Sequence, residues 1–260
     1  MALVDICELW NKTESASAVP GSGGVGASEV GVNGAVGGSP TFPLCKFGNG
    51  IYCNASGEDA AFVLNSARLN KSIIEWWMKT DYNVVNGQPT DGHHYFFEIE
   101  SSVSTETFAV LAYKIAALGL VSYAAGDGGN LGKNTIIDWS AGDLLHCMFV
   151  IDRSAGFDGA KTSALYINGA QVSSGTGALS DKGGATGAIV HFGSSTGGGF
   201  VSKATEDNPK IYTDVSAAII AEIILNSYTN NNEGWPVAGG KRMIDSGIRS
   251  NLIDGSVLVA

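Results

Sequence analysis

Charged side chains are scarce in this sequence, and basic side chains are the scarcest of them. Lys, Arg, Asp and Glu together make up 15% of the 260 residues, and 15 basic residues stand against 25 acidic ones, which gives a formal net charge of -10 at pH 7. Nucleic-acid binding depends on clusters of Lys and Arg that neutralise phosphates. The scattered basic residues of this chain therefore predict no nucleic-acid partner.

Long apolar runs are also missing. None reaches the roughly 20 residues that a helix needs to cross a bilayer. The opening sequence MALVDICELWNK carries Asp5 and Glu8 where a secretion signal needs a basic start and an unbroken apolar stretch. We therefore expect no membrane insertion, no signal peptide, and a protein that is cytoplasmic as synthesised.

Cysteine is infrequent, and the motifs of common catalytic sites are absent. Cys7, Cys45, Cys53 and Cys147 are widely spaced and form no CxxC pair of the kind that holds structural zinc, so we expect reduced, half-buried thiols. The Gly-rich segments lack the strand-to-helix context in which glycine holds a phosphate, and the spacing of Ser, His and Asp suggests no triad. The sequence thus carries no strong catalytic motif.

The sequence is rich in glycine and in short apolar runs. Its 36 glycines favour many tight turns over long helices. Gly, Asn, Asp and Ser separate the runs, which is the spacing typical of a two-sheet antiparallel sandwich. We therefore predict an all-β fold with strands in residues 50–55, 60–65, 72–80, 93–102, 107–114, 118–126, 135–140, 144–154, 163–175, 188–195 and 218–228.

Two of these segments carry further information about local structure. The alternation is strict in ALYINGAQV, where Asn168-Gly169 provides the positive backbone angles of a two-residue hairpin turn. The run from Ser216 to Tyr228 fits a helix as well as a strand, because periodicity does not decide so short an apolar run. We assign it as a strand because of its isoleucines and its position last in the series.

The N-terminal region begins with an alternating segment and continues with a Gly-rich one. Residues 3–10 alternate as an edge strand would. Residues 14–41 consist mainly of Gly, Ser, Ala and Val, which predicts a flexible or surface-hugging loop or arm instead of a helix. We expect one domain over residues 1–230, followed by a C-terminal extension over residues 231–260.

The order of several motifs resembles the laminin-G-like branch of the concanavalin A-like lectin and glucanase jelly rolls, over roughly residues 1–230. An N-terminal strand is followed by KFGNG and then by KSIIEWWMKTD. LLHCMFVIDRS and ALYINGAQV come next, with VHFGSS after them, and the run from residue 218 to residue 234 stands where the group has its closing strand. The residues that carry the match are Lys46–Gly50, Lys71–Asp81, His146, Asp152, Arg153, Tyr166, Asn168 and Gly169. The resemblance implies an antiparallel jelly-roll sandwich.

Glycoside hydrolases on related jelly rolls carry carboxylates that alternate along one strand and act as acid and nucleophile. The nearest match here is Glu98-Ile99-Glu100. The family pattern has Asp at the middle position, where Glu100 stands, and its third carboxylate falls on Ser102 or Val103. We therefore expect Glu98 and Glu100 to form a solvated strand face and the protein not to be an enzyme, and we keep a glycoside hydrolase with a degenerate site as a lesser alternative.

The resemblance also implies a possible calcium site, because laminin-G-like domains often bind calcium at a sandwich rim through oxygen ligands. The candidates are Asp127 and Asn130 in AAGDGGNLG and Asp158 in SAGFDGAKT. The same sequences are ordinary turn chemistry. We treat the three residues as candidate ligand-binding positions and assign no cofactor.

Histidines and aromatic residues offer further candidates. His93 and His94 are neighbours on a predicted strand, so they point to opposite faces and do not converge on one metal ion. Trp76-Trp77 and the run Tyr95–Phe97 contain rings that could stack on sugars, but alternation buries at least one ring of each set. His146 is expected to pack inside the sandwich.

These features predict a non-catalytic, lectin-like protein that acts by surface contact. Our first hypothesis is a surface, decoration or tail subunit of a phage or other virion, which would be oligomeric in context and would contact other capsid or tail subunits through its arm and tail. The alternative is a secreted or cell-surface carbohydrate-binding or adhesion module, whose partners would be glycans.

Overall fold

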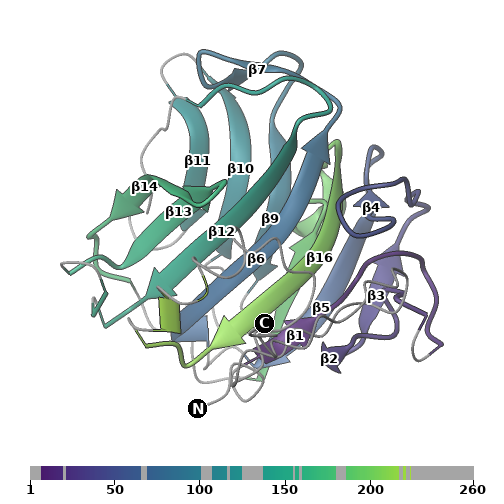
Figure 1. Ribbon diagram of the computed structural model, residues 1–260, viewed down its shortest axis with the longest axis horizontal. Coiled ribbons are helices and arrows are strands. Elements are labelled where there is room, and N and C mark those ends of the chain that lie inside the picture. The colour runs from purple at the N-terminus through teal and green to yellow at the C-terminus, as the bar shows by residue number, and fades with distance from the viewer. Residues whose placement is uncertain are drawn as a thin grey trace, which may run out of the picture.

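Two antiparallel β-sheets stacked face to face form the protein (Figure 1). In this computed structural model, all pairings between the named strands are antiparallel. The predicted all-β jelly-roll sandwich is therefore confirmed. The structure describes residues 7–19, 22–65, 69–100, 107–115, 118–124, 137–154, 156–157, 160–179, 186–216, 219–220 and 223.

The sheet that faces the viewer in Figure 1, here called the front sheet, has eight strands. Seven follow the order β14-β13-β12-β6-β16-β1-β2, and the eighth, β4, pairs with β16 outside this path. The strands are β1 (Cys7–Trp10), β2 (Val30–Gly31), β4 (Ile51–Tyr52), β6 (Lys71–Thr80), β12 (Leu144–Asp152), β13 (Ser163–Ile167), β14 (Ala170–Gly175) and β16 (Ala204–Thr213).

The sheet behind it, here called the back sheet, has six strands in the order β11-β10-β9-β15-β5-β3. They are β3 (Gly34–Gly37), β5 (Asp59–Asn65), β9 (His94–Glu100), β10 (Thr107–Ile115), β11 (Leu118–Ala124) and β15 (Thr186–Phe192). A separate two-stranded ribbon consists of β7 (Val84–Val85) and β8 (Gln88–Pro89), and a short 3-10 turn, η2, spans Thr196–Gly198. No helix within the described residues is both long enough and apolar enough to cross a membrane.

The main hydrophobic core fills the space between the sheets. Trp76 of β6 is fully buried there and meets Phe97 of β9 edge-on, with 5.2 Å between the ring centroids and 84° between the ring planes. Phe97 also contacts Phe149 of β12 and Phe192 of β15 at 6.0 and 5.9 Å. Within β6 the core side chains are those of Ile74, Trp76 and Met78, on alternate residues, as a strand with one inward face requires.

A second hydrophobic cluster lies on the outer face of the front sheet. It includes Val150 and Tyr212, packed with Val215, Ile220 and Ile223. The strand assigned to Ser216–Tyr228 is wrong in its described part, because Ile219, Ile220 and Ile223 are helical and the Ile220 N–H donates to the Ser216 carbonyl at 2.9 Å. Spacings of three and four residues place the three isoleucines on one side of a helix, which buries them as well as a strand would.

β16 is the longest strand that was not predicted from the sequence. Its sequence, ATEDNPKIYT, has the composition of a polar loop, yet all of its residues are buried. It pairs with β6 on one side and with β1 on the other. A bulge between Asp207 and Lys210 accommodates Pro209, which cannot donate to a regular ladder.

The segment 14–41 belongs to both sheets and is not a free arm in the part that the structure describes. β2 pairs with β1 in the front sheet, and β3 pairs with β5 in the back sheet. The Asn11 amide holds the segment by donating to the carbonyls of Gly24 and Val25 at 3.2 and 3.1 Å. β2 therefore lies outside β1, so β1 is not the edge strand that its alternation predicted.

The predicted hairpin is confirmed. Asn168 and Gly169 have φ values of 50° and 77° and connect β13 to β14 directly. The Asn168 side chain also accepts a hydrogen bond from the His146 N–H at 2.9 Å, which attaches the turn to β12. All four cysteines are free, as expected, but Cys7, Cys53 and Cys147 are buried and only Cys45 is half-buried as predicted. Burial raises the pKa of the Cys45 thiol to about 12, so this cysteine stays protonated at neutral pH.

Glu75 and Lys210 form a buried ion pair on the outer face of the front sheet. Their side chains are 1% and 3% exposed, and the Lys210 ammonium lies 3.2 Å from a Glu75 carboxylate oxygen. His146 is buried beside the same oxygen at 3.9 Å. It packs against Trp77 and so lies on this outer face, not between the sheets as predicted.

Breaking this pair should destabilise the fold strongly. We expect Lys210→Met to lower the free energy of unfolding by about 3–5 kcal/mol, because the substitution leaves the Glu75 charge buried without its cation. Urea denaturation measures the loss. The matched control is Lys203→Met, which removes a lysine that is 38% exposed from a pair with Asp91, and we expect it to cost less than about 1 kcal/mol. Equal losses for the two variants would contradict this assignment.

Glu206 carries its carboxyl group into the core between the sheets. It is opposite Met78 and Ile51 in the strand pairings, and both of these side chains belong to the core. Neither carboxyl oxygen has a hydrogen-bond partner among the described residues. Burial raises the pKa of Glu206 well above the ordinary value of 4.5, and the nearby Ser202 hydroxyl and Gly193 N–H lower it by less. Glu206 is therefore neutral in the folded protein at neutral pH.

A pH-dependent stability follows from this buried acid. Above pH 4.5 the unfolded chain releases the Glu206 proton while the folded protein keeps it, so rising pH destabilises the fold by about 1.4 kcal/mol per pH unit through this group. Glu206→Gln removes that contribution. We expect the variant to gain stability over the wild type as the pH rises from about 5 to about 7, measured by urea denaturation at each pH. A difference that stays constant over this range would count against a neutral Glu206.

Candidate functional site

The three ligand-binding positions predicted from the sequence, Asp127, Asn130 and Asp158, lie outside the described residues and stay predictions. Within the described part of the chain, no three His, Cys, Asp or Glu side chains gather as they would around a metal ion.

Glu98 and Glu100 lie on the outer face of the back sheet, because Ile99 between them points into the core. Both are half-buried, so the face is only partly solvated. The Glu98 carboxylate accepts a hydrogen bond from the backbone N–H of Thr196, in η2. Ser102 and Val103 fall outside the described residues. Glu98 is thus engaged in fixing a loop.

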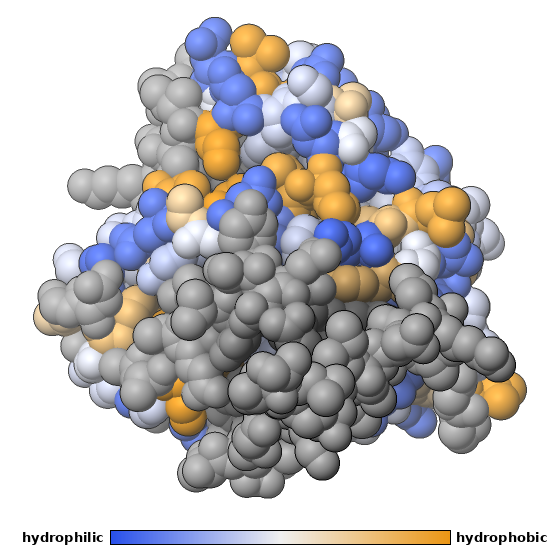
Figure 2. Space-filling view, in the orientation of Figure 1, coloured by the Kyte–Doolittle hydropathy of each residue, from blue (hydrophilic) through white to orange (hydrophobic). Residues whose placement is uncertain are grey.

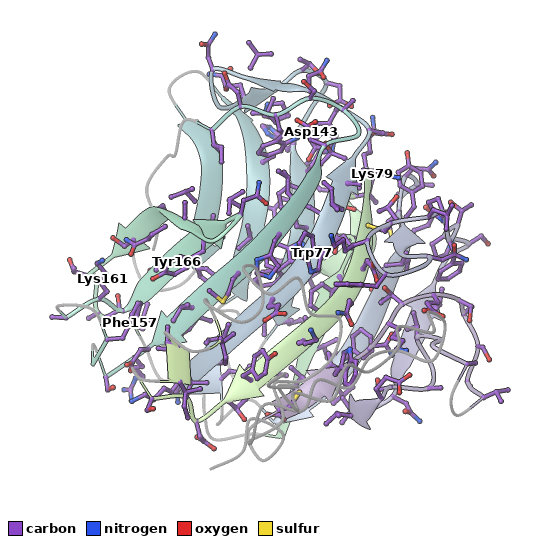
Figure 3. All side chains as sticks on the ribbon, viewed as in Figure 1. Trp77, Lys79, Asp143, Phe157, Lys161 and Tyr166 are labelled. Atoms are coloured by element: carbon purple, nitrogen blue, oxygen red, sulfur yellow. The ribbon has the colours of Figure 1, made fainter. Side chains whose placement is uncertain are left out.

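Neither member of the Trp76-Trp77 pair is an exposed stacking surface. Trp76 lies in the core, and Trp77, on the outer face of the front sheet, is 4% exposed (Figure 3). The Lys46 ammonium lies 4.9 Å from the centre of the Trp77 ring, and Phe47 meets that ring edge-on at 5.9 Å. The KFGNG motif therefore covers Trp77. Where described residues are visible on this face, hydrophobic and hydrophilic side chains alternate (Figure 2).

His93 and His94 point to opposite faces of the back sheet, as their adjacency predicted. His94 is buried and stacks on Tyr82, with 3.9 Å between the ring centroids. His93 is half-exposed and approaches Phe200 at 6.0 Å. The two rings therefore do not share a ligand.

An aromatic surface forms near the end of the sandwich where β9 begins. Phe200, in the loop between β15 and β16, stacks on Tyr95 with 5.6 Å between the centroids and 18° between the planes. His93 completes the group. Phe200 is 47% exposed and is the one exposed Phe, Tyr or Trp among the residues whose side-chain burial is described. We call His93, Tyr95 and Phe200 the rim platform.

A strand irregularity places Tyr95 on this surface. Phe97 pairs with Val110 and Tyr95 pairs with the next residue, Leu111, so Phe96 is an extra residue in β9. Phe96 and Phe97 are both fully buried, while Tyr95 is half-buried. The bulge therefore turns Tyr95 and His93 to the same outer face as Glu98.

Two charged residues are close to the rim platform in the sequence: Asp91 is two residues before His93, and Lys203 is three residues after Phe200. The Lys203 ammonium donates to Asp91 at 2.7 Å, and a ring nitrogen of His94 lies 2.7 Å from the other Asp91 oxygen. Burial acts to raise the pKa of Asp91, but the hydrogen bonds from Lys203 and His94 outweigh it and hold that pKa below its ordinary value. The same bond raises the pKa of Lys203. Asp91 and Lys203 are therefore both charged at neutral pH, at 35% and 38% side-chain exposure.

Tyr52 and Asp81 belong to the same hydrogen-bonded network as Lys203. The Tyr52 hydroxyl donates to Asp81 at 2.5 Å, and the Asp81 N–H donates to the Lys203 carbonyl at 3.0 Å. Burial and the hydrogen bond to Asp81 raise the pKa of Tyr52 to about 12, so its hydroxyl stays protonated. Phe200 and Lys203 were not predicted from the sequence, because a lone aromatic residue and a lone lysine in a glycine-rich loop form no periodic pattern.

Comparison with known proteins shows a similarity of fold alone. No protein-family model matches the chain, and no curated protein matches it. Domain 4 of AbnA, a GH43 extracellular arabinanase from Geobacillus stearothermophilus solved with arabinotriose, is similar in structure, with a TM-score of 0.58 and 13% identity. The match covers 84% of this chain and 98% of that domain.

Toxin binding domains have the same fold over part of their length. The binding domain of Paraclostridial Mosquitocidal Protein 1 matches with a TM-score of 0.55 and 14% identity over 88% of this chain. The binding domain of Botulinum Neurotoxin DC, in complex with SialylT, matches with a TM-score of 0.53 and 13% identity over 89%. The chain spans 53% of each of these two domains. The resemblance to lectin-like jelly-roll sandwiches, expected from the sequence, is thus confirmed as a likeness of fold.

Proposed function

We propose that the protein is a non-catalytic carbohydrate-binding module and that its sugar ligand stacks on the rim platform. The observation that carries this proposal is the half-exposed ring of Phe200, stacked on Tyr95, with the ion pair of Asp91 and Lys203 a few residues away along the chain. An exposed ring held in this way, with a pair of opposite charges nearby in the sequence, suits recognition of a ligand more than it suits packing.

Sugars have the surface that such a site complements. One face of a pyranose ring is a patch of C–H groups, and its edge is a ring of hydroxyls. The electron-rich face of an aromatic ring attracts the C–H groups. Asp91 accepts hydrogen bonds from hydroxyls and Lys203 donates to them, so the pair complements a hydroxyl group both as donor and as acceptor. A few polar groups around an apolar surface also fix the orientation of a ligand.

The structural neighbours support the class of ligand. The arabinanase domain was solved with arabinotriose and the neurotoxin binding domain with SialylT, so proteins of this fold hold glycans. Their identity to this chain is 13% in both cases, so the position of their ligands is not transferred. The rim platform fits a glycan directly, whereas the virion-subunit role predicted from the sequence stays a prediction.

The absence of catalysis is also part of the proposal. A retaining glycosidase needs two carboxyl groups facing one cleft, one of them free to transfer a proton. The Glu98 carboxylate instead accepts a hydrogen bond from Thr196 N–H on the outer face of the back sheet. The described residues thus supply no reason to assign hydrolysis to Glu98 and Glu100.

Phe200→Ala tests the proposed site. On a glycan array and by calorimetry with the best glycan found there, we expect binding to weaken at least about ten-fold, because truncation removes the exposed ring of the platform. The matched control is Val19→Ala, which trims another exposed apolar side chain, 65% exposed, in the N-terminal segment. It should bind as the wild type does. A wild-type protein that binds no glycan, or a Phe200→Ala variant that binds normally, would reject the proposal.

A further inference from the structure

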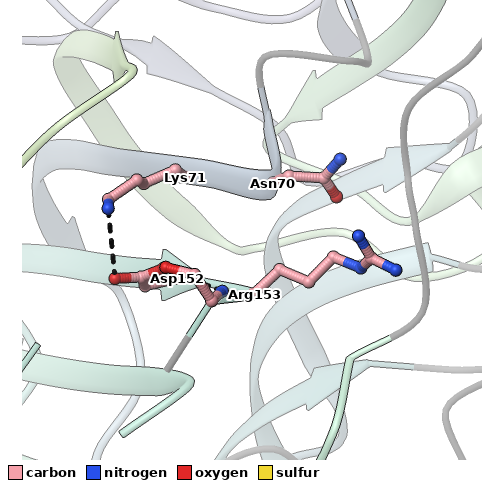
Figure 4. Close-up of a pocket in the computed structure, with 5 residues that line it drawn as sticks. Asn70, Lys71, Asp152 and Arg153 are labelled. Atoms are coloured by element: carbon pink, nitrogen blue, oxygen red, sulfur yellow. Dashed lines mark hydrogen bonds and ion pairs between the residues drawn. The ribbon is translucent and has the colours of Figure 1, made fainter. Parts of the chain in front are cut away.

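The polar groups of the depression where β6 begins and β12 ends are engaged with the protein itself (Figure 4). This depression measures about 200 Å³. The Lys71 ammonium lies 3.7 Å from Asp152, whose carboxylate also accepts from the Ser154 N–H at 2.9 Å. The Arg153 Nε–H donates to the Leu179 carbonyl at 3.2 Å. Among the described residues, the structure therefore shows no free charge there for a ligand.

The loop that carries Phe200 is held together by its own hydrogen bonds. We call residues 193–202 the platform loop. The Ser195 N–H donates to the Phe200 carbonyl at 2.8 Å, and the Phe200 N–H donates to the Ser195 hydroxyl at 3.1 Å. At the base of the loop, the Ser202 N–H donates to the Gly193 carbonyl at 2.8 Å. The two sides of the loop are thus bonded to each other, so the position of Phe200 is coupled to that of Ser195.

Glu98 attaches this loop to the back sheet. Its carboxylate accepts a hydrogen bond from the N–H of Thr196, the residue that follows Ser195. Glu98 lies on the same outer face of β9 as Tyr95, the residue on which Phe200 stacks. A hydrogen bond with an ionised acceptor is stronger than one between neutral groups. One strand therefore carries the lower ring of the stack and also holds the loop that carries the upper ring.

Two other contacts attach the platform loop elsewhere. At its base, the Gly193 N–H donates to the Phe96 carbonyl at 2.9 Å. At its tip, the Gly198 carbonyl accepts from the Ser56 hydroxyl at 2.9 Å and from the Gly57 N–H at 3.1 Å. The tip contact joins the loop to the turn before β5. The Glu98 bond lies between the base and the tip, next to the pair of bonds that fixes the Phe200 backbone.

We infer that Glu98 is a positioning residue of the rim platform, which keeps the Phe200 ring on Tyr95. It acts through Thr196 and Ser195. The inference rests on the proposed function, because the stacked ring is the surface offered to a sugar. A protein binds its ligand only in proportion to the fraction of molecules whose site is already in the competent arrangement. Holding the loop in advance keeps this fraction high and reduces the ordering cost of binding.

Aromatic NMR spectra of the full chain, labelled with ¹³C in its Phe rings, test the inference without a ligand. The Tyr95 ring displaces the signals of a Phe200 ring that stacks on it, and the Phe200→Ala spectrum identifies these signals. We expect Glu98→Ala to move them towards the values of an unstacked ring. Hydrogen exchange at the Thr196 amide should also become faster, because the bond that protects this amide is lost. The other Phe signals show directly whether the variant is folded.

Three further variants separate the hydrogen bond from the charge. Glu98→Gln keeps an accepting oxygen without the charge, so the Phe200 signals should stay in place. Glu100→Ala removes a half-buried carboxylate from the same face of the same strand and should also leave them in place. Thr196→Pro removes the donor instead of the acceptor and should move the signals as Glu98→Ala does. Ser195 has φ -76° and ψ 157°, a conformation that the residue before a proline adopts readily.

The affinity for a glycan should follow the position of the ring. The probe is the glycan that gives the strongest array signal with the wild type, measured by calorimetry. We expect Glu98→Ala to weaken its binding about ten-fold, the effect of losing one hydrogen bond to a charged group. Glu98→Gln and Glu100→Ala should stay within about three-fold of the wild type.

Several results would overturn the inference: Phe200 signals that stay in place in Glu98→Ala, an equal displacement in Glu98→Gln or Glu100→Ala, or wild-type glycan affinity in Glu98→Ala. If one of these occurs while Phe200→Ala still loses glycan binding, the inference fails and the proposed function stands. If the signals move as expected but the wild type binds no glycan, the proposed function fails and the role of Glu98 in placing the ring stands.

Discussion

The edge-on contact between Trp76 of the front sheet and Phe97 of the back sheet is the interaction on which the rest of the structure depends. It fixes the inward face of the central strand of each sheet. Side chains alternate along a strand, so a slip of one residue would exchange the two faces completely. Trp77, next to Trp76, therefore points outward beneath Phe47, and Glu98, next to Phe97, points outward towards Thr196.

Much of the sandwich could be predicted from the sequence, because most of its strands are recognisable from the local pattern of apolar residues. Short apolar runs bounded by turn residues identify β6, β12 and β13, and Asn168-Gly169 identifies the turn that follows β13. β16 could not be found in this way. Its polar side chains are buried by partners that are distant in sequence: Glu75 pairs with Lys210, and Trp10 donates to Asn208. For this reason the closing strand expected from the family resemblance was placed at residues 218–234, which follow the strand Ala204–Thr213 in the sequence.

The candidate site was harder to predict than the fold, because its residues come from segments that are far apart in the sequence. The outward position of Tyr95 depends on the bulge at Phe96, and Phe200 reaches it from a loop more than a hundred residues later. The opposite orientation of His93 and His94, by contrast, follows from adjacency alone and was predicted correctly.

The hairpin of β13 and β14 has a consequence for the behaviour of the protein at high concentration. β14 is the outermost strand on its side of the front sheet, and the unpaired edge of such a strand is a template on which other chains can add. Here Val172 is an extra residue between Gln171 and Ser173 in the pairing with β13, and the Gln171 side chain is tied to Lys161 and Tyr166. An irregular, polar edge strand of this kind pairs poorly with strands of other molecules, so this edge of the sheet resists amyloid-like aggregation.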